Sequence, residues 1–176
     1  MAVTGLTACD GGPGRNLASG GNPSGNSQRM PTNTTTFYSD KPLPKLPTVK
    51  LWLGKHELAA EIAASPRELA TGMMHRETIG EDEGMLFILP VPQRASFYMR
   101  NTKVHLSCAY IDAEGTILEI HDLQPHDEEP VFAKSNNILF VLEVKQGWFE
   151  RHSIAIGTVI RTEYGSLRET FFKRGQ

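Results

Sequence analysis

A lone acid, Glu143, interrupts the most apolar stretch of the chain, which runs from Ile138 to Val144. A carboxylate in such a stretch is costly to bury unless a cation or hydrogen-bond donors neutralise it. Arg76, Arg94 or Arg100 could supply the cation, because a guanidinium is a planar donor that can bind a carboxylate with two parallel hydrogen bonds. The sequence therefore predicts a shielded ion pair between an arginine and Glu143. Such a pair would either hold a loop in place or form the floor of a polar ligand pocket.

The ligand-pocket alternative assigns a role to each of four residues, Arg76, Tyr98, Asn101 and Glu143. Arg76 and Asn101 would donate hydrogen bonds to the ligand, and Glu143 would orient Arg76. Tyr98 would offer a stacking surface. In the structural alternative the ion pair only anchors a loop, and Asn101 with Thr102 only forms a turn after a strand. The sequence leaves both alternatives open.

Catalysis is not indicated by any motif, and no catalytic residue is assigned. The chain has no G-x-S-x-G elbow, no phosphate-binding glycine loop and no H-E-x-x-H pattern. One enzymatic alternative remains, a hydrolase acting on envelope material with Glu143 or Asp112 as general base. It requires one of these carboxylates to lie in an open cleft. A further alternative is a structural interaction module, which would expose an apolar patch and have no pocket.

Sulfur-containing side chains are the other group with possible chemistry. Thioether sulfur can bind Cu(I), and four methionines lie in apolar stretches: Met73, Met74, Met85 and Met99. Their apolar context favours core filling, and Cys108 is most simply a buried thiol. The loop from His121 to Glu129 carries two histidines and several acids, but its spacing matches no zinc or calcium motif. We therefore predict no metal and no cofactor.

Short apolar stretches separated by turns dominate the chain from Thr48 onward. They predict a mainly β fold over residues 48–165, a compact barrel or sandwich of about seven to nine short strands with two short helices. One helix is predicted to begin at Ser65, because Ser65 and Glu68 can form a capping box around Pro66. The other helix is predicted between Gln146 and His152. Residues 166–176 are predicted to be a polar C-terminal tail.

The N-terminal residues 1–47 have the composition of a flexible segment, rich in Gly, Ser, Asn, Thr and Pro. Near its start, Leu6-Thr7-Ala8-Cys9 resembles a bacterial lipobox, in which the cysteine receives lipid, although no charged and apolar leader precedes it. A lipid on Cys9 followed by a long polar tether would suit a domain anchored at a membrane surface. These features predict a cell-envelope location, either periplasmic or as a membrane-anchored lipoprotein. The alternative is a chance match and a free cysteine in a polar tail.

The overall composition argues against two classes of function. Net charge is -2 and no cluster of Lys and Arg occurs, so nothing supports nucleic-acid binding. No apolar run approaches the roughly 18 residues that a membrane-spanning helix needs. The prediction that remains is a non-catalytic cell-envelope domain that binds a small molecule, a glycan or a protein partner.

Several ordered sequence blocks resemble one family, the domain-of-unknown-function family 192 (DUF192). The blocks are Gly72-Met73-Met74-x-Arg76, Gly84-Met85-Leu86-Phe87, Phe97-Tyr98-Met99-Arg100-Asn101-Thr102, Ile111-Asp112, and Val141-Leu142-Glu143 with Gly147. The resemblance covers about residues 48–162. It implies a bacterial or archaeal protein, often exported, with a compact mainly β domain and no established activity.

This chain departs from the family pattern at three positions. Tyr98 replaces the usual Trp and keeps an aromatic ring. Ser107 and Thr158 stand where the pattern usually has Asp. A metal-binding or general-base role for those two acids would therefore not carry over to this chain.

Overall fold

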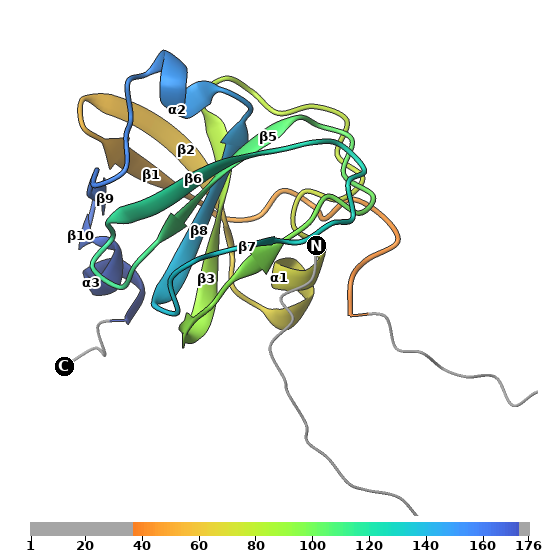
Figure 1. Ribbon diagram of the computed structural model, residues 1–176, viewed down its shortest axis with the longest axis horizontal. Helices are drawn as coiled ribbons and strands as arrows, with labels where there is room; N and C mark the ends of the chain where they lie inside the picture. The colour runs from red at the N-terminus through yellow and green to blue at the C-terminus, as the bar shows by residue number, and fades with distance from the viewer. Residues whose placement is uncertain (1–36, 173–176) are drawn as a thin grey trace, which may run out of the picture.

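The computed structural model describes residues 37–172, and every structural statement below refers to this part of the chain. The fold is mainly β, as predicted, with ten strands and three short helices (Figure 1). In chain order the elements are β1 Thr48–Leu53, β2 His56–Ala63, α1 Pro66–Thr71, β3 Glu83–Gln93, β4 Ser96–Phe97, β5 Leu106–Ile111, β6 Ile117–Leu123, β7 Val131–Phe132, β8 Ile138–Lys145, α2 Trp148–Arg151, β9 Ile160–Thr162, β10 Gly165–Ser166 and α3 Leu167–Phe172. None of these helices has the length and apolar character needed to cross a membrane.

Eight strands form one curled sheet in the order β10-β9-β1-β2-β3-β8-β5-β6, and β4 pairs separately with β7. Neighbouring strands are antiparallel except β2 and β3, which run parallel because α1 supplies the crossover between them. The sheet is not a closed ladder, but a bridge between Thr116 and Val159 brings its two ends together. The Ile117 amide donates to the Thr158 carbonyl at 2.9 Å across the same junction. The result is a barrel-like shell (Figure 1).

The curled sheet separates two hydrophobic cores. The inner core is enclosed by the curl and contains residues from both ends of the sheet, among them Leu51, Ile117 and Ile160. The outer core lies on the opposite face of the central strands and is covered by α1, β4, β7 and the intervening loops. Because side chains alternate along a strand, neighbouring residues of β8 belong to different cores: Val141 to the outer and Leu142 to the inner one.

Helix α1 begins with the predicted capping box. The Ser65 hydroxyl accepts the Glu68 amide at 3.4 Å, and the Glu68 carboxylate accepts the Ser65 amide at 2.8 Å. The helix ends at Gly72, whose positive φ of 49° reverses the chain after one and a half turns. This reversal directs the chain back across the outer core, where Met73 and Met74 are buried and His75 and Arg76 line the candidate site described below.

The ordered domain extends further in both directions than the predicted limits of 48 and 165. Residues 37–47 pack on the outer core: Leu46 is buried, and the Ser39 amide donates to the Thr71 hydroxyl at 2.9 Å. At the other end, the predicted polar tail instead forms β10 and α3, in which Leu167 is buried. Two or three apolar side chains in each polar segment carry this packing, too few to give a periodic signal. Residues 1–36, including Cys9, lie outside the described residues.

The packing of residues 37–47 gives a testable expectation. Leu46→Ala should lower the free energy of unfolding by about 2–3 kcal/mol, because truncating a buried leucine loses apolar burial and leaves a cavity. Urea denaturation followed by tryptophan fluorescence measures the change, with exposed Lys41→Ala in the same segment as the matched control. Equal stabilities for the two variants would show that the segment does not pack on the domain in solution.

Candidate functional site

The centre of the candidate site is a bidentate ion pair between Arg76 and Glu61. Arg76 Nη1 and Nη2 donate to the two Glu61 carboxylate oxygens at 2.5 and 2.8 Å. The Leu46 amide also donates to Glu61, at 2.7 Å. Burial alone would raise the pKa of Glu61, but these hydrogen bonds outweigh it and hold the pKa below its ordinary value. Because the side chains are only 18% and 10% exposed, the pair is a fixed part of the structure.

Beside this pair lies a solvent-open pocket of about 380 Å³. Its walls come from residues 42–45, strand β2, the turn after α1 and the start of β3. Six of its lining side chains are charged or can become charged: Lys45, Glu61, His75, Arg76, Glu77 and Glu83. The volume is near the lower end of the range of about 300–1,000 Å³ typical of small-molecule sites. The pocket therefore offers both donors and acceptors to a small polar molecule.

Most of these charged groups have a partner in the fold. Glu77 pairs with Lys103, and Glu83 accepts the Gly80 amide at 3.0 Å. Lys45 differs, since within the described residues it forms no ion pair and acts on Glu61 only at longer range. Its ammonium group is therefore the cation in the pocket that remains available to an anionic ligand group.

His75 connects the pocket to the predicted site residue Asn101. His75 has a positive φ of 64°, its amide donates to the Asn101 carbonyl at 2.8 Å, and its Nε2 lies 3.2 Å from the Ser39 carbonyl. Asn101 also has a positive φ, 54°, which suits the turn-forming alternative. Asn101 thus positions the pocket turn through its backbone and does not line the pocket.

Tyr98 is not a stacking surface in the pocket. It is 9% exposed and belongs to the outer core, and the Arg100 guanidinium lies over its ring at 5.2 Å. Burial raises the pKa of its hydroxyl. Among the four predicted site residues, only Arg76 lines the pocket.

The predicted ion pair of Glu143 is wrong. Glu143 is completely buried, and neither carboxylate oxygen has a hydrogen-bond partner among the described residues. The three candidate arginines have other acceptors: Glu61 for Arg76, the Ala133 carbonyl for Arg94 and Glu128 for Arg100. All three arginines lie in loops beyond the ends of the strands, whereas Glu143 lies inside the sheet between β3 and β5. Burial raises the pKa of Glu143 to about 8, so the side chain is mostly protonated at neutral pH.

The two carboxylates named for a hydrolase do not lie in an open cleft. Glu143 is sealed in the outer core. Asp112 closes the hairpin between β5 and β6, where its Oδ1 accepts the amides of Glu114 and Thr116 at 2.9 and 2.8 Å. Neither carboxylate is therefore placed to act as a general base on an external substrate.

Comparison with known proteins places these motifs in one family. The DUF192 family, described as "Uncharacterized ACR", matches residues 49–162. The chain belongs to the DUF192 family. The predicted resemblance is thus confirmed over most of the ordered domain. A search of curated proteins returned no match.

Two solved crystal structures are similar to this DUF192 domain. A protein from Sinorhizobium meliloti 1021, described as a candidate transcription regulator, is 27% identical with a TM-score of 0.65, and the match covers 68% of this chain and 97% of that chain. A protein of unknown function from Novosphingobium aromaticivorans DSM 12444 is 31% identical with a TM-score of 0.63, covering 66% of this chain and 86% of that chain. Each match covers about two thirds of this DUF192 chain and most of the other chain.

The DUF192 motifs have identifiable structural tasks here. Gly84 lies where β3 approaches β8 closely, and a Cβ at this position would be 2.6 Å from the Glu143 carbonyl oxygen. Ser107, which replaces the usual Asp, donates to Asp122 at 2.5 Å and accepts the Gly147 amide at 2.9 Å. The serine therefore links β5, β6 and the turn before α2 through two side-chain hydrogen bonds.

The most important residue that the sequence reasoning missed is Glu61. Its alternation with Leu58, Ala60 and Ile62 correctly places it on the opposite face of β2 from the inner core. That face is not solvent-exposed, because Arg76 and residues 37–47 cover it. The one available signal was an acid among the alanine and aliphatic residues of positions 58–63, the same kind of signal that singled out Glu143.

Proposed function

We propose that this DUF192 domain binds a small polar ligand in the pocket beside the Arg76–Glu61 ion pair. The observation that supports this most is the pocket itself, a volume of about 380 Å³ next to a rigid, bidentate pair. The fixed pair defines one wall without needing the ligand, so binding would not require the wall to become ordered. Lys45 then provides the charge that a ligand can neutralise.

The lining chemistry favours a ligand that carries both an anionic group and hydroxyl groups. A carboxylate or similar anion would lie on Lys45, and hydroxyl groups could donate to Glu83 and Glu77 or accept from Thr78. Acidic monosaccharides combine these groups at a size that the pocket admits. They are also both small molecules and components of glycans, two of the three partner classes predicted from the sequence.

We place this function in the cell envelope, on the basis of the Cys9 pattern and the polar segment after it. Lipid on Cys9 would anchor the domain at a membrane surface and leave the pocket free to bind its ligand. The mass of the protein isolated from its native host tests this directly, since acylation adds a defined mass at Cys9. The description of the S. meliloti protein as a transcription regulator is not carried over, because this chain has a net charge of -2 and no basic cluster.

The binding proposal is tested with Lys45→Ala. The exposed lysine makes no ion pair in the described chain, so this variant should keep the wild-type melting temperature. In a titration of glucuronic and galacturonic acids followed by NMR or calorimetry, we expect Lys45→Ala to weaken binding by about tenfold, through loss of a charge-assisted hydrogen bond. Exposed Lys55→Ala, at the turn between β1 and β2, is the matched control and should bind as wild type.

Two results would contradict the proposal. One is binding that Lys45→Ala and Lys55→Ala reduce equally, which would indicate a general effect of net charge. The other is the absence of chemical-shift changes at residues 75–78 across a panel of acidic and neutral sugars and amino acids. A shift confined to residues far from this turn would assign ligand binding to another face.

A further inference from the structure

A second solvent-open pocket adjoins the candidate site. It encloses about 550 Å³, and its lining residues come from the segment 39–46 and from the start of α1. Pro42 and Leu43 line this second pocket as well as the first one. The two pockets are therefore neighbours that share one wall, and the segment 39–46 provides that wall.

The shared wall is fixed to the domain at both of its ends. The Ser39 amide donates to the Thr71 hydroxyl at 2.9 Å, and the Leu46 amide donates to the Glu61 carboxylate at 2.7 Å. Between these ends, Leu43 is partly buried against the outer core. The wall therefore exists before any ligand binds, so a ligand need not order it.

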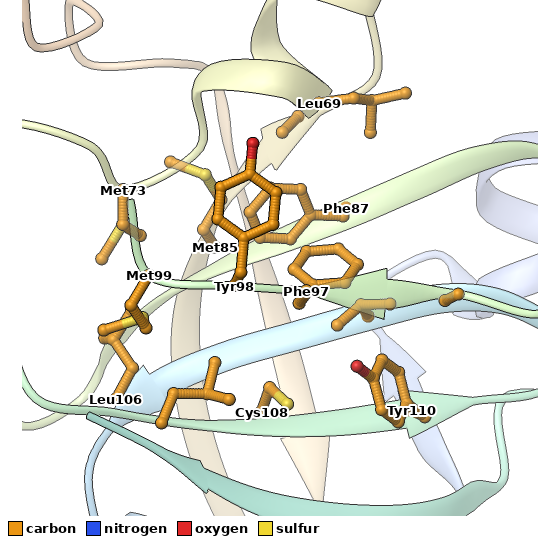
Figure 2. Close-up of a cluster of buried hydrophobic side chains, with 14 of the residues drawn as sticks. Leu69, Met73, Met85, Phe87, Phe97, Tyr98, Met99, Leu106, Cys108 and Tyr110 are labelled. Atoms are coloured by element: carbon orange, nitrogen blue, oxygen red, sulfur yellow. The ribbon is translucent and has the colours of Figure 1, made fainter. Parts of the chain in front are cut away.

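The outer side of the shared wall is apolar and faces solvent. Pro42 and Pro44 are exposed, whereas Leu43 packs on the core below them. Figure 2 shows part of that core, in which Leu69 of α1 and Met73 of the following turn lie in one cluster with aromatic side chains. A ligand that occupies both pockets therefore crosses the outer side of the wall, over the two proline rings.

The second pocket repeats the charge pattern of the first. Lys41 and Arg67 line it, and neither forms an ion pair within residues 37–172. Arg67 donates to the Ser39 hydroxyl at 3.3 Å, and the remaining donors of its guanidinium are available to a ligand. Asp40 lines the same pocket and offers a carboxylate acceptor. Each pocket thus combines a cation that has no ion-pair partner with at least one carboxylate, as Lys45 and its neighbours do in the first pocket.

We propose that the two pockets together bind an acidic oligosaccharide, with a carboxylate on each of at least two sugar units. This inference rests on the proposed function, because one acidic unit occupies the first pocket at Lys45. A second unit places its carboxylate on Arg67, whose guanidinium can bind it with two parallel hydrogen bonds. The hydroxyl groups of that unit donate to Asp40. A ligand that repeats one chemical unit then matches a surface that repeats one charge pattern.

The carboxylates in both pockets disfavour an acidic peptide as the occupant. Asp40 lies in the second pocket, and Glu77 and Glu83 lie in the first. Consecutive Asp or Glu residues bring carboxylates and backbone amides, whereas every acidic sugar unit also brings several hydroxyl donors for these acceptors. The C–H face of a sugar ring can also pack on the exposed rings of Pro42 and Pro44.

The test is a titration of the full-length protein with galacturonic acid oligomers of one to four units, followed by calorimetry and NMR. Maltotetraose is the neutral control. We expect the Kd to fall by about tenfold or more between the monomer and one of the longer oligomers, because the second contact is then intramolecular. This gain exceeds the roughly fourfold increase that the number of units alone provides. Chemical-shift changes should extend from residues 75–78 to residues 39–41.

Variants then separate the two pockets. Arg67→Met should return the affinity for the longer oligomers to that for the monomer and leave monomer binding unchanged, whereas Lys45→Ala should weaken both. Arg67 is exposed, so the variant should keep the wild-type melting temperature. Exposed Arg161→Met on β9 is the matched control for net charge and should bind every oligomer as wild type does.

Three results would overturn the inference. Equal affinity for the monomer and all oligomers, with binding still weakened by Lys45→Ala, would leave the proposed function standing and remove the second pocket from it. A gain with length that persists in Arg67→Met and in Lys41→Ala would place the second sugar unit elsewhere. Tetra-aspartate bound as tightly as the galacturonic acid tetramer would assign the surface to acidic peptides. Failure of the monomer and of every oligomer to bind would contradict the proposed function itself.

Discussion

Glu143→Gln is expected to abolish most of the pH dependence of stability between pH 5 and 8. In the unfolded chain the glutamate has an ordinary pKa near 4.5, whereas in the folded protein burial raises this pKa to about 8. The folded state therefore holds a proton that the unfolded state has released. The contribution of Glu143 to stability is therefore fully present below about pH 4.5 and is lost as pH rises through 8. At about 1.36 kcal/mol per pH unit, the loss is on the order of 4–5 kcal/mol.

The glutamine variant separates this ionisation from side-chain size. Gln has nearly the shape of protonated Glu, and both leave a polar head unpaired in the core, so the two proteins should have similar stability at pH 5. At pH 8.5 the variant should be more stable than wild type by several kcal/mol, which corresponds to a rise in melting temperature of roughly 10 °C or more for a domain of this size. Urea denaturation at a series of pH values measures the difference directly, when all curves are fitted with one m-value, the slope of unfolding free energy against urea concentration.

Exposed Glu150→Gln on α2 is the matched control, since it removes one carboxylate without changing a buried group. Its pH profile should be parallel to that of the wild type. If the Glu143→Gln and wild-type profiles were also parallel, then Glu143 would have to ionise as readily in the folded state as in the unfolded state. That result would mean that water or a cation reaches the carboxylate.

The sequence predicts the strand pattern of this domain well because the pattern depends on local properties. Three features occur where local chemistry predicts them: the turn at Gly54-Lys55, the strand from Leu106 to Ile111 and the capping box at Ser65. The apolar run that begins at Met85 favours a strand that ends before Pro90, because proline cannot donate a hydrogen bond to a neighbouring strand. In the structure β3 continues to Gln93, because a register shift after Ile88 takes both prolines out of the regular ladder.

Partner choice for charged groups could not be predicted in the same way. The sequence shows that Glu143 is buried, but not which loop reaches the open faces of the sheet. Arg76 turns away from Glu143 because Gly72 reverses the chain beside β2, where Glu61 and residues 37–47 meet it. The pairing of Arg76 with Glu61 therefore depends on residues 37–47, a polar segment whose few apolar side chains give no periodic signal. The candidate pocket is therefore a tertiary property, to which the sequence contributed only Arg76.

The second large effect is expected for the Arg76–Glu61 pair. Arg76→Met should lower the free energy of unfolding by about 3 kcal/mol, because it leaves a largely buried carboxylate without its guanidinium. Glu61→Gln should also be destabilising, since Arg76 then lacks an anion, although the Leu46 amide can still donate to the glutamine carbonyl. The double variant removes both charges, so its cost should be smaller than the sum of the two single costs, with a coupling energy of about 2 kcal/mol.

An exposed ion pair in the same protein provides the control for this double-mutant cycle. Arg168 and Glu114 lie 2.8 Å apart, with side chains 61% and 71% exposed, and their coupling should be small because solvent screens the charges. If the coupling of Arg76 and Glu61 were equally small, the pair would not be the rigid wall that the binding proposal requires. If the coupling energy is large and the double variant still folds, that variant has the pocket without its ion pair. Retained ligand binding by that variant would show that the pair shapes the fold and that Lys45 carries recognition.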